Sequence, residues 1–171
     1  MLTVGDLAPE FEGRTSDGRH VRLSDFRGRT VVLYFYPKAS SPGCTRESKQ
    51  FAAHHPTFRS HQVEVVGVSV DSAVAQQRFK ETCALPFPLL ADESKEISRA
   101  YGVLGAFGLA KRVTFIIDGT GRVARIVDSF LPGPHVEQAL RLVEAMPAAA
   151  AWESTAGSEP ASGTGDYSRS K

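Results

Sequence analysis

Short runs of β-branched and aromatic residues alternate with stretches of helical periodicity from residue 31 onward, and this order limits the possible folds more than any other feature. The runs predict strands over 31–36, 63–70, 87–90, 113–117 and 123–127. The stretches between and after them predict helices over 42–54, 72–83, 94–101 and 135–146. Pro56 is placed to stop the first helix, and residues 118–121 predict a hairpin turn. Since strand-helix-strand units pair in parallel and hairpins antiparallel, we predict an α/β fold with a central mixed sheet flanked by helices.

The two ends of the chain predict a hairpin before the central sheet and a tail after it. The turn signal Ser16-Asp17-Gly18-Arg19 predicts an N-terminal β-hairpin, and the whole order is that of the thioredoxin-like architecture. After Pro147 the composition becomes rich in Ala, Ser, Gly and Pro, which cannot bury enough apolar surface to order the segment. We therefore predict one domain over residues 1–146 and a flexible tail over 147–171, in which Trp152 is a candidate for docking onto the domain.

Cys44 lies where the first buried strand passes into a helix, and its neighbours favour a reactive thiol. Pro42 suits the first helical position, which makes Ser41 the N-cap and Cys44 the third helical residue. We expect the Ser41 hydroxyl to accept a first-turn amide hydrogen bond close to the sulfur. Free amides and the positive end of the helix dipole favour the thiolate. An inert core cysteine is the alternative, but Gly43 beside the sulfur lets a substrate approach the backbone.

Charge and composition exclude several classes of function. The chain has 20 Lys and Arg against 19 Asp and Glu, with no basic run, so we expect no nucleic acid and no membrane surface as partner. The first thirty residues show no secretory pattern, which favours a cytoplasmic protein. Two cysteines in a reducing compartment indicate chemically active thiols, and the histidines match no closed zinc spacing, so we expect no metal and no cofactor.

Two other thiol chemistries lack the residues that they need. A dithiol oxidoreductase requires Cys-x-x-Cys, and no second cysteine follows Cys44 at that spacing. A cysteine hydrolase requires a histidine base, but His54 and His55 lie about three turns further along the same helix.

The residues around Cys44 resemble the active-site signature of the peroxiredoxins. The signature is Pro37-x-x-x-Ser41-x-x-Cys44, followed downstream by Arg112-x-Thr114-Phe115-x-Ile117-Asp118. Further matches are Gly5-Asp6-x-Ala8-Pro9-x-Phe11, Tyr34-Phe35-Tyr36-Pro37-Lys38, Ser69-Val70-Asp71 and Leu85-Pro86-Phe87-Pro88-Leu89-Leu90. The resemblance spans residues 3 to about 146 and is greatest to the peroxiredoxin Q, or bacterioferritin-comigratory, subgroup.

This resemblance implies an antioxidant enzyme of cell redox homeostasis, a thiol-dependent peroxidase that reduces hydrogen peroxide and organic hydroperoxides. It implies that Cys44 is the peroxidatic cysteine, that Pro37 shields the sulfur and that Ser41 replaces the usual threonine. Arg112 is implied as the group that stabilises negative charge, and strand alternation lets its guanidinium point toward the start of the Cys44 helix. The Gly43 and Cys44 amides, with the Ser41 hydroxyl, would bind the peroxide oxygens.

A sulfenic acid on Cys44 must be resolved by a second thiol before further oxidation. Many members of the subgroup place that cysteine five positions later, where this chain has Lys49, so Cys83 is the remaining internal candidate. We favour a Cys44–Cys83 disulfide, formed after the first turn of the Cys44 helix unwinds and reduced by thioredoxin. The alternatives are a one-cysteine peroxidase recycled by external thiols and a non-catalytic redox sensor or holdase. We expect a monomer or a weak homodimer.

Overall fold

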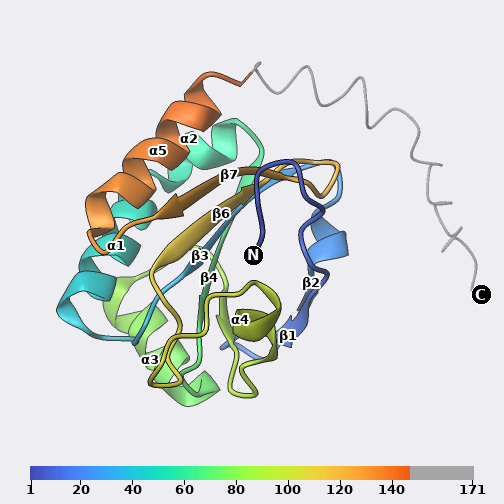
Figure 1. Ribbon diagram of the computed structural model, residues 1–171. Coiled ribbons are helices and arrows are strands. Elements are labelled where there is room, and N and C mark those ends of the chain that lie inside the picture. Colours follow the sequence, from blue (N-terminus) through green and yellow to red (C-terminus); the bar gives the residue numbers. More distant parts are fainter. Residues whose placement is uncertain (147–171) are drawn as a thin grey trace, which may run out of the picture.

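A mixed sheet of five strands forms the centre of the computed structural model, which describes residues 1–146 (Figure 1). From one edge to the other, the strands are β5 (Leu89–Ala91), β4 (Val63–Ser69), β3 (Thr30–Phe35), β6 (Val113–Ile117) and β7 (Val123–Asp128). β4 pairs in parallel with β3 and β5, whereas β6 pairs antiparallel with β3 and β7. The predicted mixed α/β fold is therefore confirmed.

Helices cover both faces of this sheet. One face is covered by α1 (Pro42–Ala53), α2 (His55–Ser60), α3 (Ala73–Cys83) and α5 (Pro132–Glu144). The opposite face is covered by α4 (Glu96–Ala100) and the 3₁₀ helix η1 (Leu23–Phe26). β1 (Glu12–Arg14) and β2 (His20–Arg22) pair antiparallel as a separate ribbon, which confirms the predicted N-terminal hairpin.

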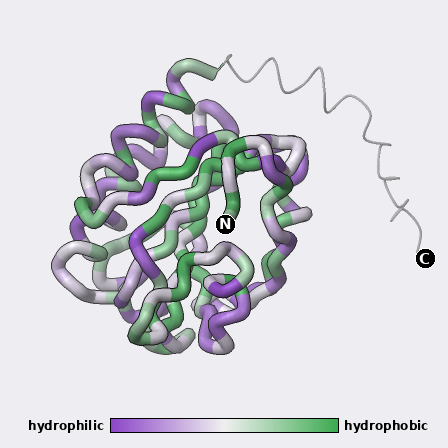
Figure 2. The backbone as a smooth tube through the Cα atoms, in the orientation of Figure 1, coloured by the Kyte–Doolittle hydropathy of each residue, from purple (hydrophilic) through white to green (hydrophobic). Residues whose placement is uncertain are grey.

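The central strand β3 is buried along its whole length, because it has sheet neighbours on both edges and helices on both faces. Tyr34 belongs to the apolar cluster under α1, α3 and α5, and Leu33 belongs to the cluster on the opposite face. Figure 2 shows the consequence, with hydrophobic residues along the central strands and hydrophilic residues on the outer turns of the helices. The chain leaves β3 after Phe35, so the residues that follow lie at the strand end, where sites form in sheets of this class.

The helices differ from the predicted ones at two prolines. Pro56 does not simply end the first helix; it is the second residue of α2, which starts after a break at His54. The last helix begins at Pro132 rather than at His135. Both differences have the same physical cause, since proline lacks the N–H that the first helical turn leaves without a partner. η1 was not predicted.

The tail over 147–171, including Trp152, lies outside the described residues. Among residues 1–146, none of the helices has both the length and the apolar character that crossing a bilayer requires.

Candidate active site

Cys44 lies in the first turn of α1, at the end of the sheet where β3 stops. Pro42 is the first helical residue and Ser41 the N-cap, so Cys44 is the third residue of the helix, as predicted. The side chain is fully buried and joins the apolar cluster that contains Tyr34 and Tyr36. The thiol is free.

Ser41 caps α1 differently from the prediction. Its hydroxyl makes no hydrogen bond to a first-turn amide; it donates instead to the carbonyl oxygen of Lys38 at 2.9 Å. The reason is a tight turn, in which the Ser41 amide also donates to Lys38 at 3.3 Å and Ser40 has a positive φ of 68°. A serine rotates freely about χ1 because it lacks the methyl group of threonine, so its hydroxyl can follow this turn.

The segment between β3 and α1 is fastened to the neighbouring strand. Pro37 is half-buried directly after Tyr36, and the buried Ala39 donates its amide to Oδ2 of Asp71 at 2.7 Å. Oδ2 of Asp71 also accepts a hydrogen bond from the Ser69 hydroxyl at the end of β4 (2.6 Å). These bonds hold the segment that precedes Cys44 against the sheet.

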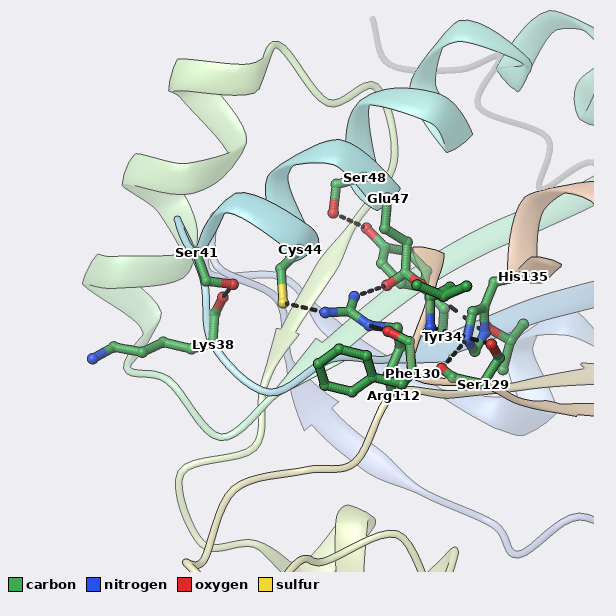
Figure 3. Close-up of polar contacts among 12 residues, drawn as sticks. Tyr34, Lys38, Ser41, Cys44, Glu47, Ser48, Arg112, Ser129, Phe130 and His135 are labelled. Atoms are coloured by element: carbon green, nitrogen blue, oxygen red, sulfur yellow. Dashed lines mark hydrogen bonds and ion pairs between the residues drawn. The ribbon is translucent and has the colours of Figure 1, made fainter. Parts of the chain in front are cut away.

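Arg112 lies just before β6 and reaches the sulfur, as predicted (Figure 3). Its Nη2 donates to Sγ of Cys44 at 3.5 Å, Nη1 donates to Oε1 of Glu47 at 3.1 Å, and Nε donates to the carbonyl of Phe130 at 3.1 Å. A Cβ at Gly43 would lie 3.0 Å from Nη2 and would require the guanidinium to shift, so the glycine leaves room for Arg112 in its observed place. The guanidinium is therefore held at three points, and one of them is the sulfur.

Glu47 is an unpredicted member of the site. It lies three residues after Cys44, on the same side of α1, and its side chain is fully buried. Burial raises the pKa of Glu47 to about 8, although the charge and hydrogen bond of Arg112 act in the opposite direction. Its Oε2 is buried and has no hydrogen-bond partner among the described residues. The spacing from Cys44 is the only sequence signal that could have identified Glu47, because a glutamate on a helix is normally a surface residue.

His135 of α5 is a second unpredicted neighbour. Its ring is fully buried, with Nδ1 2.8 Å from the Thr114 hydroxyl and 4.0 Å from Oε2 of Glu47. Its Nε2 lies 2.7 Å from the carbonyl oxygen of Ser129. Nothing in the spacing of the sequence connects His135 with Cys44, since only the tertiary fold brings α5 against α1.

Cys83 is the last residue of α3 and is half-buried, and its thiol is free. It packs against the same apolar cluster that contains Cys44 and Phe79. Burial raises the pKa of the Cys83 thiol, and the nearby charge of Lys49 opposes this effect. Within residues 1–146, no group of three or more His, Cys, Asp or Glu side chains is arranged to hold a metal ion.

Comparison with known proteins gives concordant matches. The model of the AhpC/TSA family matches residues 4–126. The chain is 39% identical to a chloroplastic peroxiredoxin Q of Oryza sativa subsp. japonica, over 85% of this chain and 68% of that protein. It is 35% identical to peroxiredoxin Bcp of Escherichia coli, over 78% of this chain and 90% of that protein.

Solved structures agree with these sequence matches. Peroxidoxin BcpB from Mycobacterium tuberculosis has a TM-score of 0.81 and 33% identity, covering 86% of this chain and all of that one (100%). A mutant of PrxQ from Xylella fastidiosa has a TM-score of 0.80 and 27% identity, covering 85% and 97%. The likeness confirms the thioredoxin-like form of the predicted fold.

Proposed function

Because the chain belongs to the AhpC/TSA family and is a peroxiredoxin, hence a thiol-dependent peroxidase, we propose that Cys44 is its peroxidatic cysteine. Enzymes of this family act on hydroperoxides and are reduced by thiol reductants such as thioredoxin. The single observation that best supports the assignment is the contact between the Arg112 guanidinium and the Cys44 sulfur, at 3.5 Å. A fixed positive charge at this distance stabilises a thiolate and the negative charge that moves onto the departing oxygen.

In the proposed step, the Cys44 thiolate attacks the terminal oxygen of a hydroperoxide. The O–O bond breaks as the S–O bond forms, which gives a sulfenic acid and an alkoxide, or hydroxide from hydrogen peroxide. The departing oxygen takes one proton from water and leaves as an alcohol or as water, so the sulfur is oxidised and the peroxide reduced by two electrons. Arg112 lies beside the sulfur throughout, held by Glu47 and by the Phe130 carbonyl.

The substrate oxygens would be bound at the start of α1. The amides of Gly43 and Cys44 belong to the first helical turn, whose N–H groups have no partner within the helix. The Ser41 hydroxyl gives its hydrogen to Lys38, so its oxygen can accept the hydroperoxide O–H. We assign the half-buried Pro37 the role of limiting access of water to the sulfur.

Cys83 is our candidate for the resolving cysteine. Its thiol would attack the sulfenic sulfur of Cys44, which forms the disulfide and releases water, and thioredoxin would then reduce the disulfide. The location of both cysteines against one apolar cluster supports this assignment. The alternative of a one-cysteine peroxidase is supported by the burial that raises the pKa of Cys83, since the thiolate is the attacking form.

Peroxide consumption with thioredoxin and thioredoxin reductase tests the cycle. We expect many turnovers for the parent and none for Cys44→Ser; a single reaction per thiol would instead indicate a redox sensor or holdase. Intact mass after one equivalent of hydrogen peroxide should show an internal disulfide in the parent and a trapped sulfenic acid in Cys83→Ser. Identical sulfenic acid products in both would establish the one-cysteine mechanism.

Three further predictions from the sequence remain proposals. We propose that residues 1–146 form the thioredoxin-like peroxiredoxin domain, that the protein is cytoplasmic, and that it is a monomer or weak homodimer. The plant relatives are named chloroplastic, so location differs among relatives. Sedimentation of reduced and oxidised protein would decide the oligomeric state.

A further inference from the structure

The fully buried His135 has no part in the step above, yet it lies next to Ser129 and close to Glu47, on the side of Glu47 away from the sulfur (Figure 3). Its Nε2 is 2.7 Å from the Ser129 carbonyl oxygen, and a carbonyl only accepts, so Nε2 bears a hydrogen. Ser129 directly precedes Phe130, whose carbonyl accepts the hydrogen bond from Nε of Arg112. The ring thus holds the carbonyl group of Ser129, and the carbonyl group of the next residue, Phe130, holds the guanidinium.

The other side of the ring faces the second anchor of Arg112. Nδ1 lies 4.0 Å from Oε2 of Glu47, and the remaining oxygen of that carboxyl accepts from Arg112. Nδ1 also lies 2.8 Å from the Thr114 hydroxyl. The imidazole therefore lies beside Glu47 and is bonded to the residue that precedes Phe130, although it makes no hydrogen bond to the sulfur or to the guanidinium.

The surroundings keep His135 neutral near pH 7. Burial is the main cause that lowers the pKa of His135; Arg112 acts in the same direction, and the Ser129 carbonyl and Asp128 oppose it. The groups that face the ring are Glu47 from α1, Arg112 and Thr114 from the β6 side, and Asp128 from β7. A neutral ring with hydrogen on Nε2 has a lone pair on Nδ1, which accepts from Thr114.

We propose that His135 is a positioning residue for Arg112, acting through its Nε2–H bond to Ser129 and through the space that its ring occupies beside Glu47. Without that bond, the Ser129 carbonyl loses its hydrogen bond to the ring, and the Phe130 carbonyl sets the direction of the guanidinium less firmly. This inference rests on the proposed role of Arg112 at the Cys44 sulfur. A purely structural His135 would instead only join the start of α5 to the sheet.

Substitutions at His135 separate these two roles. His135→Ala should lower kcat/KM for hydrogen peroxide by roughly 10- to 100-fold, the size of effect expected when a reacting group is displaced by about 1 Å. His135→Gln should restore most of this loss, because its amide places an N–H near the position of Nε2. Thr114→Ser, which keeps the hydroxyl that donates to Nδ1, is the matched control and should stay close to the parent. If His135→Ala does not fold, His135→Asn replaces it, since its shorter amide does not reach the Ser129 carbonyl.

A double-mutant comparison gives a readout that a structural role would not change. In an Arg112→Lys background, His135→Ala should cause little further loss of kcat/KM, because the group that it positions is gone. Equal losses in both backgrounds, or a lowered melting temperature with unchanged kcat/KM, would overturn the proposal, and so would a His135→Gln enzyme as impaired as His135→Ala. Peroxide consumption that persists in Cys44→Ser would overturn the proposed function itself, whereas Cys44-dependent activity that is insensitive to His135 would overturn only this inference.

Discussion

At the scale of single residues, Arg112 makes three hydrogen bonds that a lysine cannot reproduce. The planar guanidinium reaches Cys44, Glu47 and the Phe130 carbonyl at once, whereas an ammonium group keeps the charge without the fork of donors. We expect Arg112→Lys to lower kcat/KM for hydrogen peroxide by roughly 100-fold, comparable to the loss of one oxyanion donor. The exposed neighbour Lys111 is the control, and a stopped-flow measurement in which Lys111→Ala is as impaired as Arg112→Lys would contradict this assignment.

Glu47 makes the stability of the fold depend on pH at the same scale. Burial raises its pKa from 4.5 to about 8 in the folded protein, so the unfolded chain releases this proton at lower pH than the folded one. The contribution of Glu47 to the free energy of unfolding is therefore complete below about pH 4.5 and is lost as the pH rises through about 8. The free energy of unfolding, measured with urea, should fall in the parent between pH 5 and pH 8 by more than about 1 kcal/mol. Glu47→Gln should lack this decrease. Parallel curves for the two proteins would show that Glu47 does not titrate in this range.

At the scale of secondary-structure elements, we expect α1 to change when Cys44 and Cys83 form a disulfide. Cys44 is fixed in the first turn of α1 and Cys83 ends α3, and a disulfide needs Cα atoms within about 7 Å. We expect the oxidised parent to lose helix over 42–48, seen as faster amide hydrogen exchange there than in the reduced protein. Oxidised Cys83→Ser is the control and should keep its protection. A disulfide-bonded protein in which residues 42–48 remain protected would show that no unwinding is required.

The elements also show what the sequence could and could not determine. The uncharged run of β3 and the Pro42 start of α1 depend on local preferences, so the strand, the helix and the place of Cys44 were predictable. The hydroxyl of Ser41 could either accept a hydrogen bond from a first-turn amide of α1 or donate one to the Lys38 carbonyl. Only the folded turn shows that it donates to Lys38. Glu47 and His135 were missed because their burial depends on α5 packing against α1, a contact between segments distant in the chain.

At the scale of the whole molecule, the proposed site residues and the contacts described for them all lie before residue 147. The buried members of both apolar clusters lie between Phe11 and Val143, and the proposed site residues lie within that range. We therefore expect a chain that ends at Met146 to keep the kcat/KM and the melting temperature of the full chain. Trp152 is the only tryptophan, so its fluorescence in the full chain reports directly on docking of the tail. A solvent-like emission maximum should accompany unchanged stability. A blue-shifted emission together with a lower melting temperature after truncation would show instead that the tail packs onto the domain and that the domain boundary lies beyond residue 146.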